Sequence, residues 1–151
     1  MRRSIRTIRA LRFSIKLSVF LSRAEQRATL LFFVAIVSSL AAMVALLNPD
    51  FVAYHMGMLL SGVNGYSQFY AMYVGVRLAT AVLALLASRH GHQPILGDIT
   101  ALFILAQPVG RFVAAFAIGL PQGFLLIVCG IELVVGLALL AMRPRSAIER
   151  R

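Results

Sequence analysis

The chain contains four apolar stretches that approach or reach the length of a membrane span. They cover residues 28–47, 68–87, 97–118 and 124–142. A helix needs about 20 predominantly apolar residues to cross a bilayer, with a range of roughly 17–25. No stretch alternates apolar and polar residues as the strands of a membrane β-barrel do. The pattern therefore predicts an all-α membrane protein, with a bundle of four transmembrane helices in residues 28–142.

Segments that contain Lys or Arg alternate with segments that contain neither, on the two sides of successive spans. The segment before the first span is rich in arginine, the first loop (residues 48–67) has no Lys or Arg, and the second loop contains Arg89. The third loop, residues 119–123, is uncharged, and the tail at 143–151 is basic again. Because Lys and Arg favour the cytoplasmic side, both termini are predicted to be cytoplasmic. Glycine and proline in the third loop predict a tight hairpin between antiparallel third and fourth spans.

The N-terminal segment, residues 1–27, is too polar to span a membrane. At about 100° per residue, most of its basic side chains fall on one arc of a helix, beside an apolar stripe that includes Leu11 and Ile15. This pattern is typical of a basic amphipathic helix lying on the cytoplasmic surface of an anionic membrane. A disordered basic tail that only sets topology, or an arginine-rich organelle transit peptide, are the alternatives.

The first loop contains a short apolar run at residues 51–60. About ten residues cannot cross a bilayer, so the run predicts a short interfacial or re-entrant helix on the outer side. Pro49 suits the first turn of such a helix. Gly62 and Gly65 are expected to let the chain turn back into the second span.

The composition agrees with a membrane environment, and this environment decides how the positive net charge is interpreted. The chain has 151 residues, of which 60% are hydrophobic and 13% charged, whereas soluble domains carry about 25% charged residues. The net charge of +10 lies mostly outside the apolar runs, which indicates anionic lipid headgroups as partners. Nucleic acid is disfavoured, because the basic tail carries no interleaved aromatic side chains. Cys129, the only cysteine, is interpreted as a buried structural thiol.

Arg77, Arg111 and Glu132 lie inside the predicted spans. Each costs about 2.5–3.5 kcal/mol at a helix centre on insertion scales. At about 1.5 Å per residue, their depths below the outer interface are about 13, 10 and 12 Å. Charges on three helices at one level predict a buried cluster in which Glu132 bridges two guanidinium groups. Tyr73 and Gln107 share helical faces with the arginines and extend the predicted site.

Small residues at four-residue spacing are interpreted as sites of close packing within the bundle. They are Ala71, Gly75 and Ala79 in the second span and Ala106, Gly110 and Ala114 in the third. Thr80 and Thr100 are placed on the faces that carry the arginines. Gly136, one turn from Glu132, is expected to leave room for a neighbouring helix.

The predicted cluster has three interpretations. In the first, it is a structural contact that determines which helices pack together. In the second, it is a binding site. In the third, Glu132 takes part in proton relay or transport. Two cations and one anion leave a net charge of +1. A lipid phosphate, a fatty carboxylate or a quinone oxygen entering from the outer leaflet would complete such a site.

Other candidate motifs carry little chemistry. His90 and His92 are two residues apart with no acid or cysteine beside them, so no metal site is assigned. No nucleophile elbow, phosphate loop, HExxH or CxxC pattern occurs, and we assign no cofactor and no catalytic residue. Asp98 is expected to cap the N-terminus of the third span.

Residues 49–142 resemble a family of small bacterial four-helix membrane proteins known only as a domain of unknown function. The resemblance rests on FYAMYVGVRLATAVLALLA with its aromatic-rich YxG segment, on the GR of PVGRFVAAFAIGLPQG before a glycine-containing hairpin, and on the glutamate of GIELVVGLALL. The family looks distantly like the DoxX group of four-helix bundles, by fold analogy. The resemblance implies four spans, singles out Arg111 and Glu132, and supplies no reaction.

The sequence predicts a multi-pass protein of the bacterial cytoplasmic (inner) membrane and favours a non-enzymatic binding protein over an enzyme. In the first hypothesis it binds a lipid-like or quinone-like ligand, and a cavity lined by Tyr73, Arg77, Gln107, Arg111 and Glu132 would favour this. In the second it is an accessory subunit of a larger membrane complex, or a homo-oligomer, and exposed small-residue faces would favour that. In the third it is a small transporter or membrane enzyme that uses Glu132 as acid or base.

Overall fold

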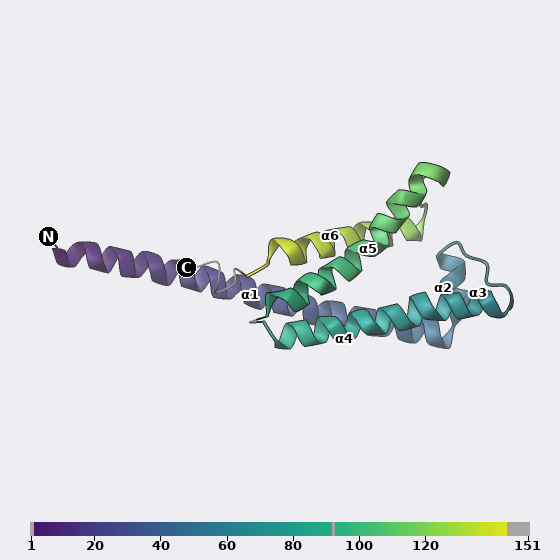
Figure 1. Ribbon diagram of the computed structural model, residues 1–151, viewed down its shortest axis with the longest axis horizontal. Coiled ribbons are helices and arrows are strands. Elements are labelled where there is room, and N and C mark those ends of the chain that lie inside the picture. Colours follow the sequence, from purple (N-terminus) through teal and green to yellow (C-terminus); the bar gives the residue numbers. More distant parts are fainter. Residues whose placement is uncertain (1, 92, 145–151) are drawn as a thin grey trace.

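The computed structural model describes residues 2–91 and 93–144, with side chains from residue 23 onward. Within these residues every regular element is helical (Figure 1). The elements are α1 (Arg2–Leu47), α2 (Pro49–His55), α3 (Gly62–Phe69), the π-helical segment η1 (Tyr70–Gly75), α4 (Val76–Arg89), α5 (Pro94–Ile118) and α6 (Phe124–Ala141).

Four helical segments among the described residues are long and apolar enough to cross a membrane, which confirms the all-α, four-span prediction. They are Arg23–Leu47, Gly62–Arg89, Pro94–Ile118 and Phe124–Ala141. The second is built from α3, η1 and α4 in continuous succession. We call the end of the bundle near Arg27 the terminal end and the opposite end, which holds α2, the loop end.

The basic N-terminal segment continues the first span without a break. α1 runs as one helix from Arg2 to Leu47 and extends well beyond the other helices (Figure 1). The segment contains neither glycine nor proline, so nothing in the sequence interrupts the helix at the junction. The helical form of the segment agrees with the sequence prediction, whereas its position on the membrane surface stays a prediction.

The loop end has the predicted short helix, with different turns from those expected. α2 begins at Pro49, and the side chain of Asn48 caps it by accepting a hydrogen bond from the backbone N–H of Phe51. The chain reverses at Gly57 and Gly62, whose φ angles are 72° and 62°, values that favour glycine. Gly65 lies inside α3 rather than in a turn, so the predicted turning role of Gly65 is wrong.

Packing pairs the helices as α1 with α4, α5 with α6, and α4 with α5. The largest buried cluster, near the terminal end, joins side chains from these four helices, and its members are Leu31, Val34, Ala35, Ala84, Ala87, Ala101, Ile104 and Leu139. Its alanines let the helix backbones approach closely. In Figure 1, α5 starts beside α4 at the terminal end and diverges from it toward the loop end.

The small residues singled out in the sequence point away from the bundle, which corrects their interpretation as internal packing sites. Ala71, Gly75 and Ala79 are exposed, and so are Ala106, Gly110 and Ala114. The arginines face inward on these helices, so residues on the opposite side face out. Gly136, by contrast, lies against the neighbouring helix α5, as the sequence predicts. A Cβ on Gly136 would lie 2.5 Å from Cγ of Leu105 on α5.

We predict that Gly136→Ala destabilises the protein by roughly 1–3 kcal/mol, because overpacking forces Leu105 or the α5–α6 contact to shift. Gly130→Ala is the matched control on the same helix, since a Cβ there meets nothing within 4 Å. Reaction of the buried thiol of Cys129 with a maleimide dye during heating in detergent reports unfolding. Equal melting temperatures for the two variants would contradict the packing described for α6.

Candidate functional site

The second span changes its winding just before it presents Arg77. Tyr70–Gly75 forms a π-helical segment, and the backbone N–H of Val76 donates to the carbonyl of Ala71. One extra residue in the turn rotates the preceding part of the helix relative to the part that follows. π-helical turns occur frequently at functional sites. Tyr73 lies within this turn, and Arg77 is the second residue of α4, which follows it.

Arg77, Arg111 and Glu132 meet in the interior of the bundle. Nη2 of Arg77 donates to Oε1 of Glu132 at 2.6 Å, and Nη1 of Arg111 donates to Oε2 of the same carboxylate. The side chains of Arg77, Arg111 and Glu132 are 18%, 15% and 8% exposed. The cluster therefore ties α4, α5 and α6 together through a single acid.

The cluster keeps a net charge of +1 in an apolar environment. An uncompensated charge inside a membrane helix costs about 2.5–3.5 kcal/mol on insertion scales, and charge-assisted hydrogen bonds offset much of that for each partner. Both oxygens of Glu132 accept from guanidinium groups. Acid or base chemistry at Glu132 therefore requires one ion pair to open, whereas anchoring and anion attraction do not.

Gln107 lies next to the cluster, one helical turn before Arg111. Nη2 of Arg111 donates to Oε1 of Gln107 at 3.5 Å. The threonines on the same predicted faces do not join the cluster, because each donates to its own helix. Thr80 bonds the carbonyl of Val76, and Thr100 bonds that of Leu96.

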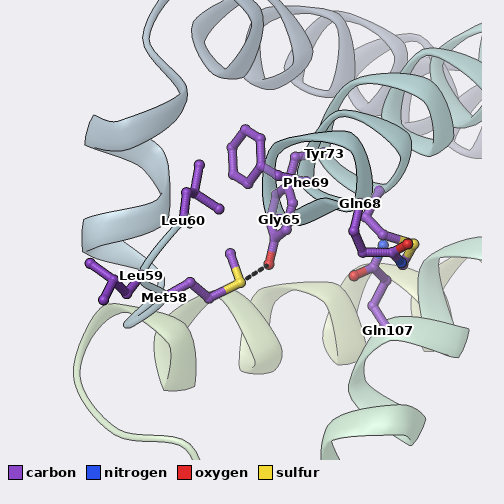
Figure 2. A pocket seen from close by; sticks show the side chains of 9 residues that line it. Met58, Leu59, Leu60, Gly65, Gln68, Phe69, Tyr73 and Gln107 are labelled. Carbon is purple, nitrogen blue, oxygen red and sulfur yellow. Dashed lines mark hydrogen bonds between the residues drawn. The ribbon is translucent and has the colours of Figure 1, made fainter. Parts of the chain in front are cut away.

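Tyr73 contacts residues toward the loop end. Its ring stacks on Phe69 with the centroids 4.8 Å apart. Its hydroxyl contacts Sδ of Met58 at 3.9 Å, the dashed line in Figure 2.

A cavity of about 490 Å³ adjoins this region at the loop end. It lies between the segment after α2, the start of the second span and the middle of α5, and its lining residues are Met58, Leu59, Leu60, Gly65, Gln68, Phe69, Met72, Tyr73 and Gln107. Figure 2 shows Gln68 and Gln107 close to each other from opposite sides, with Met58 and Leu60 across the opening. Of the five residues in the predicted site, Tyr73 and Gln107 line this cavity. Arg77 and Arg111 form ion pairs with Glu132 instead.

A second cluster, which the sequence interpretation missed, lies at the terminal end. Nη2 of Arg27 donates to Oδ1 of Asp98 at 2.5 Å, and Nε of Arg143 lies 2.9 Å from Oδ2 in an ion pair. Arg27 is 4% exposed, although it ends the basic segment 1–27 that the sequence predicts to lie on the membrane surface. Asp98 lies a full turn inside α5, whose N-cap is Gln93, so the predicted capping role of Asp98 is wrong.

Gly97 makes this second cluster possible, because a Cβ there would lie 2.8 Å from Cζ of Arg27. The guanidinium also donates to the carbonyl of Pro94 at 3.3 Å, while its buried Nε has no hydrogen-bond partner. The signal that could have found the cluster is the position of Arg27 and Asp98 at the same end of neighbouring spans.

No metal site is apparent among the described residues, since no three His, Cys, Asp or Glu side chains come together there. Nδ1 of His90 lies 2.9 Å from the carbonyl of Leu86, one turn earlier in α4. His92, the other member of the histidine pair in the second loop, lies outside the described residues.

Comparison with protein families matches residues 26–142 to a family described as a domain of unknown function (DUF4345). The match covers more than half of the chain and takes in the four spans apart from the first three residues of the first, together with Arg27, Asp98 and the cluster around Glu132. A search of curated proteins and a search of solved structures gave no match.

We predict that Glu132→Gln destabilises the protein by about 3 kcal/mol or more, because removing one partner leaves two buried guanidinium groups without a counter-charge. The triple variant Arg77→Met, Arg111→Met, Glu132→Leu should recover most of this loss, since an apolar replacement leaves no buried charge. Thermal unfolding followed through Cys129 measures both. A triple variant less stable than Glu132→Gln would contradict this account.

Asp98→Asn should destabilise the terminal end by about 3 kcal/mol, because Arg27 stays buried after its carboxylate partner is removed. Glu25→Gln is the control. Glu25 is exposed, and the hydrogen bond it accepts, from Thr29, goes to its backbone carbonyl, so a change below about 0.5 kcal/mol is expected. The same unfolding assay compares the two variants. Equal losses of stability would contradict the expected contribution of the Arg27–Asp98 ion pair.

Proposed function

Because the chain belongs to the family described as a domain of unknown function, DUF4345, its function must be argued from its own residues, and we propose that it binds a lipid-like or quinone-like ligand. The protein is non-enzymatic in this proposal and resides in a bacterial cytoplasmic membrane with both termini inside. The ligand occupies the cavity at the loop end and directs a polar oxygen toward the Arg77–Glu132–Arg111 cluster.

The observation that carries this proposal is that Gln107 belongs to both features. It lines the cavity and accepts from Arg111 of the cluster. An apolar cavity and a buried net positive charge therefore meet at one side chain. Ligand sites combine mostly apolar walls with a few polar groups that fix orientation.

The cavity walls suit an amphipathic molecule. Met58, Leu60 and Met72 offer flexible apolar surface, and methionine adapts to irregular shapes. The amides of Gln68 and Gln107 carry N–H donors that can hold a carbonyl, carboxylate or phosphate oxygen. The +1 charge behind Gln107 favours an oxygen that bears negative charge.

Entry is proposed from the membrane at the loop end. Leu59, which lines the cavity, is 93% exposed. An exposed leucine is compatible with the apolar hydrocarbon of a bilayer. If the positive-inside rule holds for this chain, the loop end faces outward and the ligand comes from the outer leaflet.

An accessory role in a larger membrane complex, or a homo-oligomer, is the second candidate. It is favoured by the outward-facing small residues, Ala71, Gly75 and Ala79 on the second span and Ala106, Gly110 and Ala114 on α5. Small residues at four-residue spacing let another transmembrane helix approach closely.

Filling the cavity should separate the two candidates. We predict that Gly65→Leu lowers binding of oleate and of decylubiquinone at least tenfold, because Gly65 lines the cavity and a Cβ there has only ordinary contacts. Gly110→Leu adds the same bulk on an exposed face where nothing lies within 4 Å. Native mass spectrometry of the purified full chain with each added probe measures bound molecules and oligomeric state together.

Loss of probe binding in Gly65→Leu, with binding kept in Gly110→Leu, supports the ligand proposal. Loss of higher-order assembly in Gly110→Leu alone supports the accessory role. Unchanged binding of both probes in Gly65→Leu, or no saturable binding by the wild type, would overturn the ligand proposal.

A further inference from the structure

A second groove lies between α1 and α4 on the outer surface of the bundle. It has a volume of about 490 Å³. Ala35 and Ala81, both nearly fully buried, and Ser39 have short side chains along it, while Phe32 and Leu85 are larger lining residues nearer one end. Arg89 lies at that end. We call this feature the α1–α4 groove. It shares no lining residue with the cavity at the loop end.

The length of the α1–α4 groove matches one leaflet of a bilayer. Its lining residues extend from 32 to 40 on α1 and from 78 to 89 on α4, or about 12–16 Å at 1.5 Å per residue. Half of a hydrocarbon core of about 30 Å is about 15 Å. Arg89, the last residue of α4, therefore reaches the interface when the groove spans the hydrocarbon of the leaflet at the terminal end.

Charge at the terminal end favours an anionic headgroup. Arg89 has no ion-pair partner among the described residues. The same end of the bundle holds Arg27 and Arg143, which share the single carboxylate of Asp98 and leave a net charge of +1 in that cluster. A guanidinium binds phosphate through a planar fork of N–H donors, so Arg89 is suited to the phosphate of a lipid whose chain lies in the groove.

We propose that the α1–α4 groove is a binding site for an anionic phospholipid, with one acyl chain along Ala35, Ser39 and Ala81 and the phosphate on Arg89. This lipid lies in the opposite leaflet from the ligand of the loop-end cavity. The proposal therefore does not rest on the function proposed above, and it assigns a structural lipid to the α1–α4 pair.

The test uses native mass spectrometry of the purified full chain with added dioleoyl phosphatidylglycerol or dioleoyl phosphatidylcholine. The two probes share their acyl chains and differ in headgroup charge. Arg89→Ala should weaken phosphatidylglycerol binding roughly fivefold, with little change for phosphatidylcholine. Arg23→Ala, which removes an exposed arginine outside the groove, is the matched charge control.

A second pair of variants tests the acyl-chain part. Ser39→Phe fills the groove from an exposed position on α1, whereas Val37→Phe adds a similar ring to an exposed position outside it. Ser39→Phe should lower binding of both lipids several-fold, and Val37→Phe should leave both unchanged.

Selective loss in Arg89→Ala together with loss in Ser39→Phe supports the site. The proposal is overturned if Arg23→Ala and Arg89→Ala weaken phosphatidylglycerol equally, because the attraction would then be a general property of the basic end. It is also overturned if the wild type binds both lipids equally, or if Ser39→Phe binds as the wild type does.

Discussion

The pairing of one carboxylate with two arginines from other helices is the interaction on which this bundle depends. Glu132 on α6 accepts from Arg77 on α4 and from Arg111 on α5. Asp98 on α5 repeats the arrangement at the terminal end with Arg27 of α1 and Arg143 after α6. In a solvent that cannot hydrate charge, each of these groups is costly alone. The two clusters therefore link α4 and α5 to α6, and α1 to α5, while the apolar packing of α1 against α4 and of α5 against α6 forms the rest of the bundle.

Sequence pattern was sufficient for the spans and for the inner charges, because both follow from the cost of polar groups in hydrocarbon. Equal depths of Arg77, Arg111 and Glu132 along three spans indicated a common level. The same reasoning did not find the Arg27–Asp98 contact, since arginine near an interface is normally read as a topology signal. It also misassigned the small residues such as Gly75 and Gly110. A four-residue spacing defines a face and does not say whether the face turns to the bundle or to lipid.

The predicted site divides into an ion-pair cluster and part of a cavity wall. Tyr73, within the π-helical segment Tyr70–Gly75, stacks on Phe69 and lines the cavity, whereas Arg77 pairs with Glu132. No residue pattern in YAMYVG requires this winding, so it was not predictable from helical periodicity. Gln107 then connects the cavity with the cluster. The apolar cavity at the loop end therefore lies next to the net positive charge of the Arg77–Glu132–Arg111 cluster.

A double-mutant cycle on Arg77 and Glu132 tests the central claim most directly. The free energy of unfolding is measured in a membrane mimetic for the wild type, Arg77→Met, Glu132→Gln and the double variant. We predict a coupling of about 1.5 kcal/mol or more, because Glu132→Gln leaves Arg77 buried without its counter-charge and Arg77→Met then removes that unpaired charge. Additive losses, within about 0.5 kcal/mol, would contradict it and would show that the two side chains act independently.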